Sequence, residues 1–217
     1  MLVRLMLGLI FANGQHDEGI NYQELADKAD VVICADGGAN AAYRQGVVPH
    51  YIIGDMDSIE PTVLEYYREK KTILKVYPVN KDFTDTQLAI NLAETLHINE
   101  LILLGTLGKR MDHGISNLYS SIKAVERGVR VEHKTAEMSV YIIKDQLHLK
   151  GKLDEVVSIF SLTAEVHGVT TAGLQYPLQE ASLRLDEPYA VSNCLTAPTA
   201  SVSVETGILA VFHLHCK

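Results

Sequence analysis

The residues with the clearest potential for chemistry lie in the stretch GDMDSI, Gly54–Ile59. It follows the short apolar run Tyr51–Ile53 and precedes a helix-like segment that opens at Pro61. Asp55 and Asp57 are two positions apart, so extended backbone directs both carboxylates to the same side. Two such carboxylates repel each other unless a cation lies between them, and oxygen-only ligands suit a hard ion such as Mg²⁺. Gly, Asp and Ser are also ordinary turn residues, so a simple turn is the alternative.

Other charged residues occupy equivalent positions along the chain. Each follows a predicted strand, and the loops after parallel strands emerge together at the carboxyl edge of a sheet, where ligands bind. The acidic residues placed there are Asp36, Asp55, Asp57, Asp82, Asp85 and Asp112, and the basic ones are Lys81, Lys109 and Arg110. Like charges crowded on one edge destabilise the fold unless something compensates them. Mg²⁺ with a bound polyphosphate would do so, since carboxylates take the metal while Lys and Arg take the phosphates.

Each of these residues also has a purely structural interpretation. Asp85 in a first helical turn is stabilised by the helix dipole, and Asp112 could cap the next helix. Asp36 could belong to a turn, and Lys81 or Lys109 could be a solvated surface charge. His113 is the one histidine on the predicted edge, and a packed histidine is its alternative.

The glycine-containing loops support a phosphate site without matching a known nucleotide fingerprint. ADGGAN (35–40) and GTLG (105–108) precede helices, and their glycines would let backbone N–H groups approach a phosphate at a helix N-terminus. Neither loop matches G-x-G-x-x-G or the P-loop pattern, so a nicotinamide enzyme and a P-loop kinase fit poorly. No nucleophile motif stands out. Metal, positioning and charge without a covalent intermediate are typical of phosphoryl-group transfer.

The elements that must position these residues alternate along the first part of the chain. The predicted strands are 2–12, 31–35, 51–53, 73–77, 101–104 and 129–132. The predicted helices are 22–28, 39–45, 61–69, one that begins at Thr84 with capping-box spacing, and 115–127. Alternating helices and fully apolar strands predict an α/β fold with a mainly parallel sheet covered by helices.

After about Lys134 the pattern changes to strands without helices between them. The predicted strands are 140–150, 155–162, 166–171 and 201–214. Alternation in the last of these predicts that His213 and His215 lie on a polar strand face rather than binding a metal. We therefore predict an α/β domain at 1–134 and a second, antiparallel all-β domain at 135–217, which is small enough to need a packing partner.

Composition narrows the classes of partner. The 217 residues are 47% hydrophobic and 21% charged, as in an ordinary soluble globular protein. The net charge of −8 argues against nucleic acid or an anionic membrane as the main partner. No apolar run has transmembrane length, and the opening MLVRLMLGLIFANG is better explained as a strand than as a signal peptide. Three cysteines without C-x-x-C spacing suit a reducing cytoplasm, each as a small buried apolar residue.

Taken together, these motifs resemble the bacterial thiamine pyrophosphokinases. The resemblance runs through ADGGAN (35–40), GDMDSI (54–59), KDFTDTQLAI (81–90) and GTLGKRMDHGISNL (105–118). It continues through GVTTAGLQYPL (168–178), VSN (191–193) and VETG (204–207). The resemblance implies an α/β catalytic domain followed by an antiparallel β-sandwich, in a homodimer with sites at the interface. The implied reaction moves the pyrophosphoryl group of ATP to the hydroxyl of thiamine, giving thiamine diphosphate and AMP.

Residue roles carried over by motif are expectations of the same kind. Asp55, Asp57 and Asp85 would hold Mg²⁺, and catalysis would also involve Arg110 and Asp112. The residues expected to bind ATP or its phosphates are Asp36, Gly37, Lys81, Asp82, Gly105, Gly108, Lys109 and His113. Ser192 and Asn193 match the Ser-Asn pair near thiamine in this family.

Three other functions remain open on the residues alone. A pyrophosphokinase for another hydroxymethyl heterocycle, such as a pterin, would differ only in its acceptor. A sensor of a nucleotide or of thiamine phosphate would bind its ligand without turnover, although pure binding needs fewer carboxylates. A metal phosphohydrolase would release phosphate without any acceptor.

Overall fold

The structure is a computed structural model that describes residues 5–215 of the chain. The chain divides between Thr135 and Ala136 into two compact units. Unit 1 is the part up to Thr135, and unit 2 is the part from Ala136 onward. No helix of the described residues is long and apolar enough to cross a membrane.

Unit 1 alternates strands and helices as predicted. Its strands are β1 (Leu7–Phe11), β2 (Val31–Ala35), β3 (Tyr51–Gly54), β4 (Ile73–Val76), β5 (Glu100–Leu104) and β6 (Arg130–Lys134). Its helices are α1 (Tyr22–Lys28), α2 (Gly38–Arg44), α3 (Pro61–Glu69), α4 (Asp85–Thr95), α5 (Met111–Ser120) and α6 (Ile122–Glu126). Residues 2–4 of the first predicted strand lie outside the described part.

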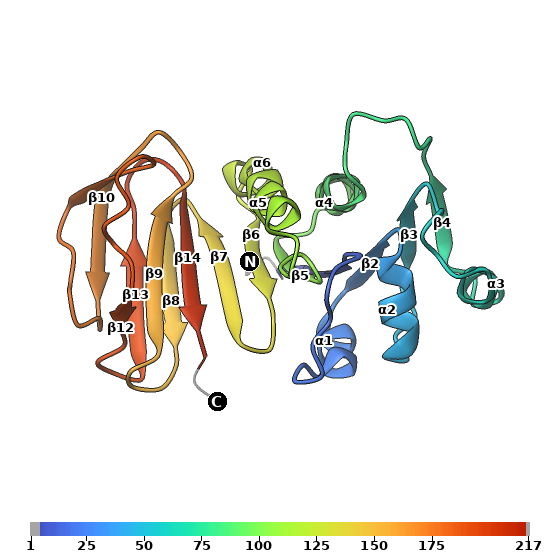
Figure 1. Ribbon diagram of the computed structural model, residues 1–217, viewed down its shortest axis with the longest axis horizontal. Helices are drawn as coiled ribbons and strands as arrows, with labels where there is room; N and C mark the ends of the chain where they lie inside the picture. Colours follow the sequence, from blue (N-terminus) through green and yellow to red (C-terminus); the bar gives the residue numbers. More distant parts are fainter. Residues whose placement is uncertain (1–4, 216–217) are drawn as a thin grey trace. The chain divides into compact units, whose positions relative to one another are not determined.

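The six strands of unit 1 form a parallel sheet in the order β6-β5-β1-β2-β3-β4. The chain runs outward from β1 to β4 and then returns to place β5 on the other side of β1. Helices α1 to α3 cover one face of the sheet and α4 to α6 the other (Figure 1). This arrangement confirms the predicted α/β class, and it creates a switch point between β1 and β5 at which loops diverge and leave room for a ligand.

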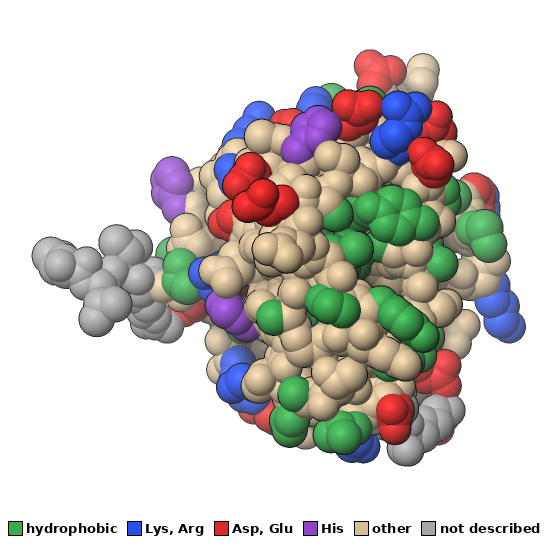
Figure 2. All heavy atoms as spheres, turned by 90° about the vertical axis from the view of Figure 1, so that its left-hand side faces the viewer, with side chains coloured by type: hydrophobic (Ala, Val, Ile, Leu, Met, Phe, Trp, Pro, Cys, Tyr) green, Lys and Arg blue, Asp and Glu red, His purple; other side chains and the backbone are tan. Residues whose placement is uncertain are grey.

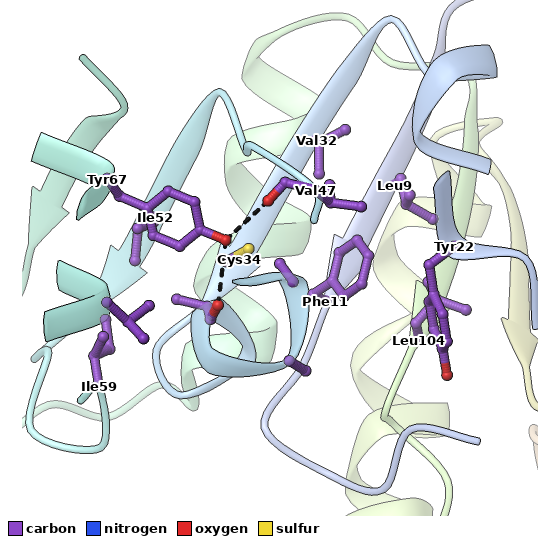
Figure 3. Close-up of a cluster of buried hydrophobic side chains, with 14 residues drawn as sticks. Leu9, Phe11, Tyr22, Val32, Cys34, Val47, Ile52, Ile59, Tyr67 and Leu104 are labelled. Carbon is purple, nitrogen blue, oxygen red and sulfur yellow. Dashed lines mark hydrogen bonds between the residues drawn. The ribbon is translucent and has the colours of Figure 1, made fainter. Parts of the chain in front are cut away.

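The core between the sheet and α1 to α3 is a tightly packed apolar cluster (Figure 3). Alternate residues such as Phe11 of β1 and Cys34 of β2 point into it, because successive side chains of a strand face opposite sides. Tyr67 of α3 is fully buried there and donates its hydroxyl to the carbonyl of Val47 at 2.8 Å. Burial also raises the pKa of the Cys34 thiol, which agrees with the expectation of an inert apolar residue.

Two helix starts follow directly from the sequence. Helix α4 begins with the predicted capping box, in which the Thr84 hydroxyl accepts from the Gln87 N–H and the Gln87 side chain accepts from the Thr84 N–H. Helix α3 begins with Pro61, whose missing N–H would have had no partner at that position. Because Asp85 is the first residue of α4, the capping box fixes where this carboxylate lies.

Unit 2 is an antiparallel β-sandwich. Its strands are β7 (Met138–Ile143), β8 (Gln146–Lys150), β9 (Val156–Ser161), β10 (Glu165–Ala172), β11 (Ala181–Arg184), β12 (Asn193–Cys194), β13 (Thr199–Ser203) and β14 (Leu209–Leu214). Strands β12-β9-β14-β7 form one layer and β11-β10-β13-β8 the other. Buried residues of both layers, such as Val157, Val169 and Val211, form one apolar core.

Three predicted elements differ from the structure. The predicted helix 115–127 is two helices, and it begins earlier, at Met111, because Gly114 is tolerated within the first turns. It breaks at Ser121, whose hydroxyl donates to the Asn117 carbonyl and competes with the helical hydrogen bond. The predicted strands 140–150 and 201–214 are each two strands joined by a turn. The short strands β11 and β12 lacked a strong apolar signal and were not predicted.

The turn that divides the predicted strand 201–214 also changes which residues are buried. The break between β13 and β14 resets the alternation, so His213 is buried with 1% of its surface exposed, while Leu214 is exposed. The prediction that His213 lies on a polar strand face was therefore wrong.

Candidate active site

Unit 1 contains a pocket of about 700 Å³ at the carboxyl edge of its strands. Its walls come from the loops after β1, β2, β3 and β5 and from the first turns of α4 and α5. The predicted residues that line it are Asp36, Asp55, Asp57, Asp85, Gly105, Gly108, Lys109, Arg110 and His113. Loops far apart in the sequence thus converge, as the parallel-sheet rule predicts.

Three carboxylates form the most concentrated group in this pocket. Oxygen atoms of Asp36, Asp55 and Asp57 all lie within 4.8 Å of one another. Asp36 is buried, and its Oδ1 atom has no hydrogen-bond partner among the described residues. A buried, unpaired carboxylate oxygen beside two further carboxylates is a donor set for a hard divalent cation, so these residues fit Mg²⁺.

Lys81 compensates part of this negative charge. Its Nζ atom lies 2.8 Å from Oδ2 of Asp55 and 3.1 Å from Oδ1 of Asp85. The hydrogen bond from Lys81 lowers the pKa of Asp55, whereas burial raises the pKa of Asp85 despite the same lysine. Lys81 therefore links the carboxylate that follows β3 to the one that opens α4.

The backbone around these carboxylates is tightly constrained. Gly54 has φ +146°, and a Cβ atom there would lie 2.9 Å from Oδ1 of Asp85 and 3.0 Å from Cβ of Asp36. Asp36 itself has φ +44° and Met56 has φ +68°, in the left-handed region that L-residues rarely adopt. Strained backbone concentrates at functional sites, because only surrounding structure that needs the geometry maintains it.

A hydrogen-bonded chain connects the loop after β2 with the loop after β3. The Asn40 side chain of α2 donates to the Ser58 carbonyl at 2.8 Å and accepts from the Glu60 N–H at 3.0 Å. The Ser58 hydroxyl in turn donates to Oδ1 of Asp57 at 2.9 Å. Asn40, the last residue of ADGGAN, thus positions the loop that carries Asp55 and Asp57.

A buried polar network holds the GTLG loop against α5. His133 of β6 is fully buried, with its two ring nitrogens 2.8 Å from Oγ1 of Thr106 and 2.9 Å from Oγ of Ser121. The Asn117 side chain donates to the Thr106 carbonyl at 2.8 Å. Burial lowers the pKa of His133 to about 3, so the ring is neutral. Its two hydrogen bonds connect Thr106 of the GTLG loop to Ser121 at the end of α5.

At the mouth of the pocket, Arg110 is exposed and pairs with its neighbour Asp112. Its Nη2 atom lies 2.6 Å from Oδ2 of Asp112, and this hydrogen bond lowers the pKa of the carboxyl. Because α5 begins at Met111, Asp112 lies in its first turn rather than capping it. Arg110 is free to turn toward an anion in the pocket, since an exposed ion pair contributes little to stability.

The loop after β1 is a part of the pocket that the sequence interpretation missed. Asn13, Gly14 and Gln15 line the wall, and the ring of His16 stacks on Phe11 with centroids 5.7 Å apart. A Cβ at Gly14 would lie 2.1 Å from the carbonyl oxygen of Gly105, so these two loops are in backbone contact. This loop also follows a parallel strand, but the residues of it that line the pocket carry no charged side chain, so the charge pattern did not indicate them.

Other predicted residues lie outside the pocket lining. Gly37 is buried at the start of α2, where a Cβ atom would lie 2.4 Å from the Asn13 side chain. Asp82 is exposed in the loop before α4. Lys81 and Asp112 reach the site through their ion pairs with lining residues, as described above.

The Ser192–Asn193 pair lies in unit 2 and is structurally engaged. Asn193 accepts from the Tyr176 N–H at 3.0 Å and donates to the Tyr176 carbonyl at 2.7 Å. Ser192 has φ +57° and donates its N–H to the Ser158 hydroxyl. Asn193 therefore fixes the loop that presents the exposed ring of Tyr176, which sequence interpretation did not single out.

A parallel α/β unit whose pocket at the carboxyl edge of the strands combines carboxylates with basic side chains has the features of an enzyme that binds a phosphorylated ligand. Comparison with known families agrees. Residues 22–133 match the model of the thiamin pyrophosphokinase catalytic domain, and residues 142–209 match that of its vitamin B1 binding domain. The chain belongs to the thiamine pyrophosphokinase family of enzymes.

Individual relatives support the same assignment. A thiamine pyrophosphokinase of Bacillus subtilis is 25% identical over 185 residues, which cover 84% of this chain and 86% of the relative. One from Saccharomyces cerevisiae is 35% identical over 113 residues, covering 43% of this chain and 34% of the relative. The crystal structure of the Bacillus subtilis protein has the same fold, with a TM-score of 0.85 at 21% identity, covering 98% of this chain and 100% of that one.

Proposed function

We propose that this protein transfers the pyrophosphoryl group of ATP to the hydroxyl of thiamine, giving thiamine diphosphate and AMP. The observation that carries the proposal is the convergence of Asp36, Asp55 and Asp57 in a pocket that also presents Lys109 and Arg110. Carboxylates beside basic side chains suit a metal-bound polyphosphate, and family membership supplies thiamine as the acceptor.

In this proposal Asp55 and Asp57 hold Mg²⁺ together with Asp36, and Asp85 lies beside them in contact with Lys81. When bound, the ion would neutralise phosphate charge and polarise the phosphoryl oxygens. Compared with the expectation from sequence, Asp36 joins the metal set because of its unpaired buried oxygen.

The remaining side chains position the substrates. Arg110 and Lys109 steady the charge of the transferred group, and Gly105 and Gly108 let the polyphosphate approach the backbone. The thiamine hydroxyl attacks the β-phosphorus in line, AMP leaves, and one of the clustered carboxylates accepts the hydroxyl proton. His113 and the loop after β1 line the same pocket and would contact the nucleotide.

The two units have different roles in this proposal. Residues 1–134 bind ATP and Mg²⁺, while residues 135–217 bind thiamine, with Ser192 and Asn193 near the acceptor, and form a homodimer. Hydrophobic side chains gather on the face displayed in Figure 2. The exposed large apolar residues of unit 2 include Leu153, Tyr176, Leu185, Tyr189 and Val191. A monomeric mass in light scattering at assay concentration would rule out the dimer.

The decisive experiment is AMP formation from ATP and Mg²⁺, with and without thiamine. We expect AMP only with thiamine, in amounts that match thiamine diphosphate, and none after chelation of the metal. AMP formation with a pterin alcohol instead would change the acceptor, and phosphate release without any acceptor would indicate a hydrolase. ATP binding without AMP under all conditions would indicate a sensor.

A further inference from the structure

A second group of metal-binding side chains lies in unit 2, formed by Glu155, His213 and His215. Antiparallel pairing of β14 with β9 places Leu214 opposite Val156 and His213 opposite Val157. Continued by one position, this register would set His215 opposite Glu155, and His213, two residues earlier, points to the same face as His215. Sheet geometry therefore brings one carboxylate and two imidazoles together.

The three side chains are close enough to bind one metal ion. One nitrogen of each histidine and one oxygen of Glu155 all lie within 4.8 Å of one another. Nε2 of His213 lies 2.9 Å from Oε2 of Glu155, so a hydrogen bond joins these two atoms. The ring centroids of His213 and His215 are 4.7 Å apart.

We propose that Glu155, His213 and His215 bind a zinc ion, with a fourth position open to water. Two imidazoles and a carboxylate form a donor set typical of Zn²⁺, whereas Mg²⁺ prefers oxygen alone. Tetrahedral zinc with bonds of 2.0–2.1 Å separates neighbouring ligand atoms by about 3.4 Å. Replacing the shared proton of His213 and Glu155 by the ion therefore requires that these atoms move apart by only about 0.5 Å.

The surroundings hold these ligands in place. Glu155 and His213 are buried, with 3% and 1% of their surfaces exposed. The Lys152 N–H donates to Oε2 of Glu155 at 3.0 Å, and the Ser139 hydroxyl lies 3.1 Å from Nε2 of His215. Such contacts orient ligands around a metal in the way that outer partners of zinc sites do.

The space beside the cluster also depends on Gly151. A Cβ there would lie 2.2 Å from Oε2 of Glu155 and 2.9 Å from Cε1 of His213. Zinc at this point would join the start of β9 to the end of β14 and stabilise unit 2. This site is separate from the acidic pocket of unit 1 and does not depend on the proposed reaction.

The test measures zinc binding by the tag-free full-length chain after removal of metals by EDTA and dialysis. Titration with Zn²⁺ against a chromophoric chelator should reveal one tight site per chain. His215→Gln removes a ligand that is only half buried, and it should weaken this site by about 100-fold or more. Co²⁺ in place of Zn²⁺ should give the intense visible absorption of a four-coordinate ion in the wild type and lose it in this variant.

Two control variants separate this site from others. His148→Gln removes an exposed histidine of β8, and Asp57→Asn alters the acidic pocket, so both should keep the tight zinc site and the cobalt spectrum. Saturating zinc should raise the Tm of the wild type by about 5–10 °C and that of the His215 variant by much less.

Three outcomes would overturn the proposal. They are the absence of tight zinc binding, equal affinity in the wild type and His215→Gln, and loss of the site in Asp57→Asn. In the first case Glu155 and His213 are simply a buried hydrogen-bonded pair. Failure of the thiamine reaction would leave the zinc result untouched, because none of these measurements uses turnover.

Discussion

Replacing Lys81 by Met tests whether one lysine compensates the carboxylates of the acidic pocket. Its ammonium contacts Asp55 and Asp85, and the three side chains are only 12%, 10% and 27% exposed. Removing one partner of a fully buried pair costs about 3–5 kcal/mol, and partial exposure reduces this through screening. We therefore expect Lys81→Met to lower the free energy of unfolding by about 2–3 kcal/mol at pH 7 without metal.

The pH dependence of this loss has a definite sign. Lys81 lowers the pKa of Asp55, so its stabilisation is complete above the unfolded value of about 3.9 and disappears as pH falls through the lowered folded value. Burial raises the pKa of Asp85, so ionising it costs stability as pH rises, and the lysine opposes this cost. Both effects make the difference between wild type and Lys81→Met largest near neutral pH, and the difference should shrink as the pH falls through the range in which these carboxylates are protonated.

Urea unfolding followed by far-ultraviolet circular dichroism measures this difference, because all six helices of the described residues lie in unit 1. Lys28→Met is the matched control, since Lys28 and Glu24 form an exposed pair of 62% and 55% exposed side chains. Its effect should stay within about 0.5 kcal/mol. Mg²⁺ at a hundred times its Kd should raise the free energy of unfolding of Lys81→Met by about 2.7 kcal/mol. Equal losses in the two variants, or a loss independent of pH, would refute the reasoning.

Three further changes probe the same site. Asp57→Asn should lower thiamine-dependent AMP formation by at least about 100-fold with an unchanged circular dichroism spectrum, and near-normal turnover would contradict its metal role. Gly54→Ala should lower the free energy of unfolding, measured in urea, by about 2 kcal/mol, because the new Cβ strains the backbone and crowds Asp85. An unchanged urea midpoint would show that the loop accommodates the Cβ without strain. His133→Ala should lower the free energy of unfolding by about 3 kcal/mol. His148→Ala, which removes an exposed histidine, should lower it by less than about 0.5 kcal/mol. Because the folded pKa of His133 is about 3, wild-type stability should fall as pH drops below about 6.5, by up to about 1.4 kcal/mol per pH unit, and the variant should lack this slope.

The sequence alone predicts the α/β unit well because its signals are local. Fully apolar strands, Pro61 at a helix start and the Thr84–Gln87 capping box are each decided within a few residues. The acidic edge follows from them, since parallel strands bring their carboxyl ends together. Unit 2 is harder, because its short strands β11 and β12 are stabilised by pairing with distant segments rather than by their own composition.

Within the site, the sequence predicts the charged residues of the pocket but not the uncharged residues that hold its loops in place. The loop of Asn13 and the hydrogen bonds of His133 depend on contacts across the fold, as does the inward orientation of His213 in unit 2. A one-residue change of strand phase is enough to turn a side chain from solvent to core, and only the position of the turn before β14 determines that phase.

The return of the chain from β4 to β5 has a consequence for how the protein forms during synthesis. Met6 hydrogen-bonds with Asn99, 93 residues later, and the pocket loops after β1 and β5 touch through Gly14 and Gly105. Contacts of such high sequence separation form late and slowly, because a long loop must close before they contribute. A ribosome-bound chain that has exposed Asp36 and Asp55 still lacks the walls of the pocket that come from the loop after β5 and from α5. The carboxylates that follow β2 and β3 therefore leave the ribosome before Lys109 and Arg110, the basic side chains that share the pocket with them.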